Sequence, residues 1–401
     1  MNLRQSYECH IIRIPNVMVG LNSVKKLNEG LRNFGKRALV IAGRNAVESG
    51  RLKVVEAELV EAEVDYIVYS DYGPEPTIGQ AEKVFDYVAE LVKSDMKIDF
   101  IIGFGGGSSL DMAKTASLAS ANPKPLKQYI GVERVPKKGL PLILIPTTAG
   151  SGSEVSKSIV LIDEREEIKD SIVSENVTAD LAVVDPLLTI TMNPRLTAIT
   201  GIDALSHAIE AYMSLKANAF TDSLALKAIS LISTNLRRAY SNGENIEARR
   251  AMSEAALLAG LAFSNSSNCI GHAIAYSFAA KYRIPHGMAC GISLPYVMKF
   301  NMLAIPERLA EIAIAMGLEE GGLSSRELAQ LAIAEVFDLI TDLDLPTTLE
   351  EMGVPEEDVI KLAEKALRIT RLVEANPRKL SLEDARKIFE TMWRGDLETK
   401  I

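Results

Sequence analysis

The fold is decided by one short stretch, Asp99-Phe100-Ile101-Ile102-Gly103-Phe104-Gly105-Gly106-Gly107-Ser108-Ser109-Leu110-Asp111-Met112-Ala113-Lys114. Its first four residues are typical of a buried parallel strand, and apolar residues recur at helical spacing from Leu110 to Ser120. Three successive glycines between them let the backbone approach an anion, because free N–H groups at a helix start attract phosphate. The stretch predicts a strand, a phosphate-binding turn and a helix. A sharp turn with purely structural glycines is the alternative.

The spacing of this turn differs from both common phosphate-binding signatures, since it is not G-x-G-x-x-G and no Gly-Lys-Ser/Thr follows. Ser108 and Ser109 can cap the helix and donate to phosphate oxygens. A second candidate loop is Pro146-Thr147-Thr148-Ala149-Gly150-Ser151-Gly152-Ser153-Glu154. It supplies hydroxyl groups where a predicted strand ends, which is where open α/β sheets bind ligands. Together the two loops predict a nucleotide-binding site, although each is also compatible with an ordinary solvated loop.

Similar strand and helix patterns extend outward from the opening stretch in both directions. Further predicted strands are Ala38–Ile41, Val64–Tyr69, Leu142–Ile145, Ser158–Ile162 and Leu181–Val184, and further predicted helices are Val47–Val60 and Ile78–Val92. Strands that alternate with helices favour an α/β sheet covered by helices. The first part of the chain is therefore predicted to be a Rossmann-like α/β domain.

After about Met192 the pattern becomes entirely helical. Long Ala- and Leu-rich stretches predict helices, at Thr197–Met213, Ala219–Tyr240, Ala248–Phe263 and Ser324–Ile340. We expect breaks between helices at Ser241-Asn242-Gly243, Pro285, Pro295 and Pro306. The chain is thus predicted to contain an α/β domain over residues 1–190 and an all-α domain over residues 191–401.

Composition excludes several classes of protein. Of the 401 residues, 47% are apolar and 24% are charged, as in ordinary globular chains. The net charge of −9 and the lack of a long basic run argue against nucleic acid or acidic lipid as a partner. No apolar run approaches the roughly 20 residues of a membrane span, and the first residues lack the apolar stretch of a signal peptide. With only Cys9, Cys269 and Cys290, a cytoplasmic location is expected.

Three of the four histidines lie in distinctive contexts. Asp203 and His207 are four residues apart and so share one helix face. His272 follows a glycine, and His286 follows Pro285, which is expected to end the helix that carries His272. One carboxylate and three imidazoles suit Fe²⁺ or Zn²⁺, whereas core packing is the alternative role for each histidine. His10 lies in a predicted strand without such a context.

Taken together, these motifs resemble the iron-containing, or group III, alcohol dehydrogenases along nearly the whole chain. The resemblance is carried by Gly105 to Ser108 with Asp111 and Lys114, by Pro146 to Glu154, by Asp185-Pro186, by Gly201 to Glu210, and by Gly271-His272 through Pro285-His286-Gly287 and Leu294 to Met298. It implies a dinucleotide-binding domain followed by a helical metal-binding domain, the architecture also found in dehydroquinate synthase. By the family pattern the metal ligands are Asp203, His207, His272 and His286.

The resemblance also implies positions for the cofactor and an assembly. It assigns the pyrophosphate to Gly105, Gly106, Gly107 and Ser108, with Ser109 and Asp111 in the same motif, the adenosine side to Thr147, Thr148 and Ser151, and further cofactor contacts to Ser156 and Lys169. Many members are homodimers or larger assemblies, so self-association is expected. The implied activity is hydride transfer between NAD(P)(H) and a small alcohol or aldehyde whose oxygen is bound to a divalent metal, with Fe²⁺ preferred over Zn²⁺.

The chain departs from the family pattern at several positions. Tyr276 replaces a histidine often discussed as a proton shuttle, and its unperturbed pKa near 10 makes it a poor relay, so packing is the favoured role. NAD-dependent members commonly have an acidic residue where this chain has Gly43, followed by Arg44. Without that carboxylate, and with an arginine able to pair with a 2′-phosphate, NADP is favoured over NAD.

Small polar residues in two regions are candidates for contact with a polar substrate. Asn265 and Asn268 precede His272, although their alternative role is to satisfy backbone groups at a helix end. Ser158 lies past the second loop. Cys269 is expected to be a buried, inert thiol. Glu75, in Pro74-Glu75-Pro76-Thr77, replaces an asparagine common in the family motif, with no predicted consequence.

The predicted function is a metal- and NAD(P)-dependent alcohol dehydrogenase or aldehyde reductase. Two alternatives share the architecture. One is a hydroxyacid–oxoacid transhydrogenase, in which the cofactor stays bound between two substrates. The other is a lyase like dehydroquinate synthase, which uses NAD transiently with a metal.

Overall fold

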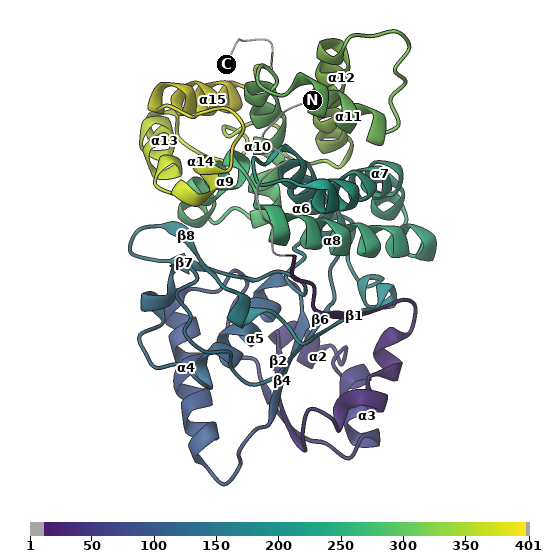
Figure 1. The fold of residues 1–401 in the computed structure, drawn as a ribbon, viewed down its shortest axis with the longest axis vertical. Helices are drawn as coiled ribbons and strands as arrows, with labels where there is room; N and C mark the ends of the chain where they lie inside the picture. The colour runs from purple at the N-terminus through teal and green to yellow at the C-terminus, as the bar shows by residue number, and fades with distance from the viewer. Residues whose placement is uncertain (1–11, 398–401) are drawn as a thin grey trace. The chain divides into compact units, whose positions relative to one another are not determined.

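The computed structural model describes residues 12–397, which divide into two compact units (Figure 1). One unit is residues 14–191; the other is residues 192–397 together with Ile12 and Arg13. The division falls between Thr191 and Met192, beside the boundary at residue 190 expected from the sequence. His10 and Cys9 lie outside the described residues.

The first unit is built on a parallel sheet of six strands in the order β1-β9-β6-β4-β2-β3. The strands are β1 (Asn16–Val19), β2 (Arg37–Ala42), β3 (Asp65–Tyr69), β4 (Phe100–Gly105), β6 (Leu142–Pro146) and β9 (Leu181–Val184). The helices of this unit are α1 (Asn28–Leu31), α2 (Arg44–Glu48), α3 (Lys53–Glu61), α4 (Ile78–Lys93) and α5 (Gly107–Ala119). Because β2, β4 and β6 are parallel neighbours, the loops that follow them lie along one edge of the sheet.

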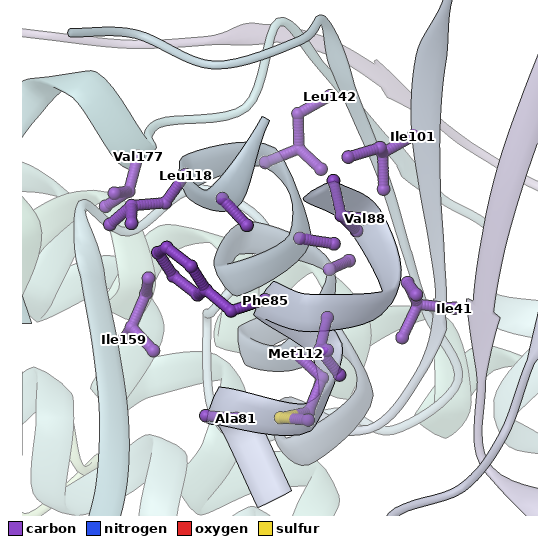
Figure 2. Packing of buried hydrophobic residues seen from close by; sticks show 14 of the residues in the cluster. Ile41, Ala81, Phe85, Val88, Ile101, Met112, Leu118, Leu142, Ile159 and Val177 are labelled. Carbon is purple, nitrogen blue, oxygen red and sulfur yellow. The ribbon is translucent and has the colours of Figure 1, made fainter. Parts of the chain in front are cut away.

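Hydrophobic residues are buried on both faces of this sheet. Alternate residues of β2 point to opposite faces, so Leu39 joins the cluster with α4 and α5, whereas Val40 joins the cluster with α3. In Figure 2, Phe85 of α4 lies beside Leu118 of α5, in the cluster that also contains Ile41, Ile101 and Leu142 of the strands. A sheet buried on both faces explains why its strands are short, continuous apolar runs.

Two details of this unit correct the sequence prediction. The helix expected over Val47–Val60 is split, because Gly50 turns the chain in a left-handed conformation (φ 74°) between α2 and α3. The strand expected over Ser158–Ile162 is present, but it lies outside the parallel sheet. It forms β7 (Ser158–Asp163), which pairs antiparallel with β8 (Ile168–Val173) beside β5 (Gly131–Val132) in a separate sheet. Strand β8 was missed because Lys169 and Asp170 interrupt its apolar pattern.

In the second unit, the described residues form helices joined by loops and no strand. Its helices are α6 (Pro194–Met213), α7 (Ala219–Ser241), α8 (Ile246–Ser266), α9 (Ile270–Tyr282), α10 (His286–Asn301), α11 (Pro306–Ala315), α12 (Ser325–Asp342), α13 (Val359–Leu367), α14 (Thr370–Glu374) and α15 (Leu382–Arg394). Helix α6 packs against α7, α8 and α10, and α9 packs against α10 and α13. The predicted fold class, an α/β part followed by an all-α part, is confirmed. None of the described helices is long and apolar enough to cross a membrane.

One expected helix break in this unit was wrong. Pro295 lies inside α10 rather than at its end. Proline in a helix interior costs about 3 kcal/mol, because it removes a hydrogen bond and clashes with the preceding turn. Nearly every residue of α10 is buried, including Pro295 itself, so tertiary packing offsets that cost.

Candidate metal centre and cofactor loops

The four residues proposed as metal ligands come together in the helical unit. Asp203 and His207 lie one turn apart on α6, His272 lies on α9, and His286 is the first residue of α10. Each offers one ligand atom, and these atoms all lie within 4.8 Å of one another. His286 is partly exposed and the other three are buried. One carboxylate oxygen and three imidazole nitrogens are a donor set that suits Fe²⁺ or Zn²⁺.

Close helix packing brings these ligands to one place. A Cβ atom at Gly271 would lie 1.7 Å from Oε1 of Glu210 on α6. A Cβ atom at Gly287 would lie 2.2 Å from the carbonyl oxygen of Ile199, also on α6. The glycine beside each histidine therefore lets α9 and α10 approach α6 closely enough for their histidines to reach Asp203 and His207.

The environment of His272 fits a metal ligand. Its Nδ1 lies 3.0 Å from Oε2 of Glu210, and both side chains are about 1% exposed. Its other nitrogen, Nε2, is buried and has no hydrogen-bond partner among the described residues. When Nδ1–H donates to the carboxylate, Nε2 carries the lone pair and is able to bind a cation. A buried imidazole nitrogen without a partner is costly, and a metal ion would satisfy it.

Three further side chains surround the cluster, and sequence reasoning gave them no role there. The His207 ring stacks on Phe263 with centroids 4.4 Å apart. Cys290, one turn after His286 on α10, has its sulfur 3.6 Å from that ring. Glu210 also accepts a hydrogen bond from the backbone N–H of Cys269 (2.7 Å). Spacing was the available signal, since Glu210 follows His207 by three residues and so lies on the same helix face.

Tyr276 lies beside the cluster. It is one turn beyond His272 on α9 and is 4% exposed. Its ring centroid is 5.4 Å from that of His286 and 6.0 Å from that of His272. Asn265 forms hydrogen bonds with backbone groups. Its amide donates to the carbonyls of Leu261 and Arg13, and its Oδ1 accepts from the N–H of Arg13.

In the α/β unit, the glycine-rich turn and the second predicted loop touch each other. Gly105 ends β4 with φ 146°, a conformation that favours glycine, and its carbonyl accepts from the N–H of Thr147 (2.9 Å). A Cβ atom at Gly107 would lie 3.0 Å from Ser151, and one at Gly106 would lie 3.4 Å from Thr148. The two loops thus form a narrow cradle of backbone N–H and hydroxyl groups, which fits a dinucleotide pyrophosphate.

A buried network braces this cradle from within. The ammonium of Lys114, which is fully buried, donates to the hydroxyls of Ser153 (2.9 Å) and Ser156 (3.0 Å) and to the carbonyl of Ser158 (2.8 Å). Asp111 accepts from the Ser153 hydroxyl (2.6 Å) and the Val160 N–H (2.9 Å). Asp111 and Ser156, both expected at the cofactor, therefore join helix α5 to the second loop.

Burial shifts the pKa of three groups in this region, and it raises that of Asp111. It lowers the pKa of Lys114, and the carboxylates of Asp111 and Glu154 oppose that shift. It raises the pKa of Glu154 to about 7, although its own backbone N–H and the Lys114 ammonium favour the charged form.

The remaining predicted cofactor residues surround the same sheet edge. Gly43 follows β2 and caps α2, and the exposed guanidinium of Arg44 lies 3.6 Å from Asp71. Lys169, on β8, is buried, and its ammonium lies 3.0 Å from Oε2 of Glu75. The hydroxyl of Ser108 accepts from the backbone N–H of Glu75 (3.0 Å).

Comparisons with known proteins agree with this arrangement. The model of the iron-containing alcohol dehydrogenase family matches residues 15–186, and the C-terminal model of the Fe-containing alcohol dehydrogenase family matches residues 197–393. Long-chain-alcohol dehydrogenase 1 of Geobacillus thermodenitrificans (strain NG80-2) is 37% identical over 391 residues, which cover 96% of this chain and 97% of that protein.

Solved structures give the same result. A crystal structure of 1,3-propanediol oxidoreductase superposes with a TM-score of 0.91 at 34% identity, over 96% of this chain and 100% of the other. Sulfoacetaldehyde reductase from Bifidobacterium kashiwanohense, in complex with NAD⁺, has a TM-score of 0.84 at 27% identity, over 97% and 100% of the two chains.

An α/β unit with a candidate phosphate cradle and a helical unit with a carboxylate–histidine cluster are the parts that a metal- and nicotinamide-dependent enzyme requires, and the named relatives place the chain among the oxidoreductases. Within that class, the chain belongs to the iron-containing alcohol dehydrogenase family. Its enzymatic class is that of an NAD(P)-dependent alcohol dehydrogenase.

Proposed function

We propose that this enzyme interconverts a small alcohol and its aldehyde or ketone by using Fe²⁺ held by Asp203, His207, His272 and His286. The observation that carries the proposal is the meeting of four ligand atoms within 4.8 Å, contributed by three helices. The buried, unpartnered Nε2 of His272 supports it, because a cation would satisfy that atom. When bound, a divalent metal lowers the pKa of an alcohol hydroxyl and stabilises the developing alkoxide.

The chain's own residues hold and shield this centre. Glu210 fixes the ring and tautomer of His272 through the 3.0 Å contact with Nδ1. Phe263 covers one face of the His207 ring and keeps water from it. Tyr276 packs against the histidines and leaves the proton to water or to the cofactor ribose.

The cofactor is proposed to bind at the cradle in the α/β unit, and when bound it would supply the hydride acceptor or donor for the substrate carbon. Gly105, Gly106, Gly107 and Ser108 would hold the pyrophosphate, and Thr147, Thr148 and Ser151 would line the adenosine side. The support is the contact between the two loops. Asp111 and Ser156 would act through the brace that they form with Lys114.

NADP(H) is the proposed cofactor rather than NAD(H). No carboxylate stands at Gly43 to repel a 2′-phosphate, and the side chain of Arg44 is 66% exposed and so accessible to one. Asp71 lies 3.6 Å from the Arg44 guanidinium, so the 2′-phosphate would share Arg44 with a carboxylate. We therefore expect a moderate preference rather than exclusive use of NADP(H).

Anaerobic reconstitution tests the proposal. Metal-free enzyme is loaded with Fe²⁺ or Zn²⁺ and assayed with a panel of small alcohols and aldehydes, with both NADP(H) and NAD(H) supplied in solution. Turnover that requires metal and consumes the supplied cofactor is expected. Full activity of verified metal-free enzyme would refute the metal assignment, and activity only between two bound substrates would favour a transhydrogenase.

A further inference from the structure

One ion pair, between Lys169 and Glu75, lies beside the glycine-rich turn. Lys169 on β8 is 4% exposed, and its ammonium lies 3.0 Å from Oε2 of Glu75. The Glu75 side chain is 27% exposed, so solvent reaches the glutamate of this pair but hardly reaches the lysine. A buried ammonium needs a partner of opposite charge, and Glu75 supplies one within the protein.

The pair is held next to the turn by the backbone. The N–H of Glu75 donates to the hydroxyl of Ser108 (3.0 Å), the residue directly after Gly107. The next residue, Pro76, accepts from the N–H of Ile162 on β7 (3.0 Å), and Thr77 caps helix α4. The loop that carries Glu75 is therefore fixed to the turn, to the hairpin that carries Lys169 and to α4.

The backbone at Glu75 carries a conformational cost. Its φ of 51° is in the left-handed region, which asparagine adopts more readily than glutamate. Glutamate at this position therefore gains no stability from its backbone. What distinguishes it from asparagine is a longer side chain with a charge, and that charge is the one that meets Lys169.

We propose that Glu75 is a determinant of cofactor affinity, whose carboxylate competes with the dinucleotide pyrophosphate for the ammonium of Lys169. The inference rests on the proposed cofactor site. While Glu75 neutralises Lys169, the cradle offers the pyrophosphate its N–H and hydroxyl donors without a free positive charge. Replacing the carboxylate by an amide makes the ammonium available as a charge-assisted donor to phosphate oxygens. Glu75 thus weakens cofactor binding and favours cofactor release.

Calorimetric titration with ADP-ribose tests this, because that probe contains the pyrophosphate but no nicotinamide and needs no metal. We expect Glu75→Gln and Glu75→Asn each to lower the Kd of ADP-ribose roughly three- to tenfold. Adenosine, which has no phosphate, should bind all forms equally. Asparagine also suits the left-handed backbone at position 75. Glu75→Asn therefore tests the effect of the charge on the Kd even if Glu75→Gln disturbs the fold.

Two controls locate the effect. Asp65→Asn removes the carboxylate that pairs with Arg37 (3.3 Å) at the opposite edge of the sheet and should leave the Kd unchanged. In a Lys169→Met background the gain from Glu75→Gln should shrink, since there is no ammonium to release. An unchanged or weaker Kd for both Glu75 variants would overturn the inference, as would an equal gain without Lys169. If the unmodified enzyme fails to bind ADP-ribose, the proposed cofactor site itself is wrong.

Discussion

In the helical unit the candidate metal ligands are side chains from three helices, whereas in the α/β unit the candidate cofactor site is largely backbone and hydroxyl groups. The ligands meet because α9 and α10 pack closely on α6 at Gly271 and Gly287. The cradle forms because two neighbouring parallel strands end at the same sheet edge. Substitution of a single side chain should therefore have its largest effect at the metal site. Cofactor binding at the cradle should depend instead on backbone conformation and on charge.

Removing a metal ligand should have the largest effect. His272→Ala is expected to lower kcat/KM by about 10³-fold or more, because a metal contributes several kcal/mol of transition-state stabilisation. Metal content, measured on the purified variant, should fall with activity. Normal metal content and activity would remove His272 from the centre.

Glu154 should make the stability of the α/β unit depend on pH. Its carboxyl has a pKa of about 7 in the folded protein, against an ordinary pKa of 4.5. The folded state therefore holds the proton more tightly, so stability is highest below the lower value and is lost as the pH rises through 7. Relative to the neutral Glu154→Gln variant, the unmodified protein should be less stable by about 3 kcal/mol above pH 8 and nearly equal at pH 4.5.

Urea unfolding of both proteins across this pH range measures the difference. The fluorescence or circular dichroism midpoints should separate as the pH rises. A constant difference between the two proteins at all pH values would show that Glu154 does not titrate in this range.

Glu210 should control metal affinity without binding the metal. Loss of a carboxylate partner of a ligating histidine typically costs 10- to 100-fold in affinity, so Glu210→Ala is expected to weaken metal binding by about that factor. Glu210→Gln keeps an acceptor oxygen, so its metal affinity should lie between those of the unmodified protein and Glu210→Ala. Competition with a chelator gives the affinities. Asp358→Asn, which alters the ion pair to Lys281 on the same helix α9, is the matched control and should bind metal normally.

Position 43 should tune cofactor choice by charge alone. A Cβ atom at Gly43 would lie 3.5 Å from the Ser109 hydroxyl, an ordinary contact, so the Cβ of Gly43→Asp is accommodated. Repulsion between that carboxylate and a 2′-phosphate should lower the ratio of kcat/KM for NADPH over NADH by about tenfold. Gly43→Asn has the same shape without the charge and should leave the ratio near its original value. Equal effects of the two substitutions would argue for a steric cause.

Tyr276 should give the smallest effect. If it only packs against the histidines, Tyr276→Phe changes kcat by less than about threefold, because a hydroxyl that transfers no proton contributes little to the barrier. The pH profile of kcat should also stay the same. A large loss with an altered profile would show that Tyr276 relays the proton.

Local patterns were sufficient to predict the strands β2, β3, β4, β6 and β9 of the parallel sheet and the helices α4 to α8 and α12. Asp203 and His207 could be paired because four residues make one helical turn, and Pro285 marked the start of the helix that carries His286. The sequence also indicated both loops of the cradle, since each follows an apolar strand. These features depend on neighbours within a few residues.

What could not be predicted depends on partners far apart in the chain. The pairing of β7 with β8 depends on tertiary contacts, and Asp111 engages Ser153 and Val160 rather than solvent. Glu210 meets His272 across 62 residues, and Glu75 meets Lys169 of strand β8, which is also far from it in the chain. Proline inside α10 shows the same limit, because only burial explains how the helix tolerates it.

The placement of the four ligands on three helices has a thermodynamic consequence. Helices α6, α9 and α10 pack together in one unit, and a cation bound to all three is bound only when that packing exists. Under the proposed assignment, metal binding and folding of the helical unit are linked equilibria. Each tenfold rise in free metal above the dissociation constant then adds about 1.4 kcal/mol to the free energy of unfolding. The metal supply of the cell would in this way set the lifetime of the enzyme as well as its activity.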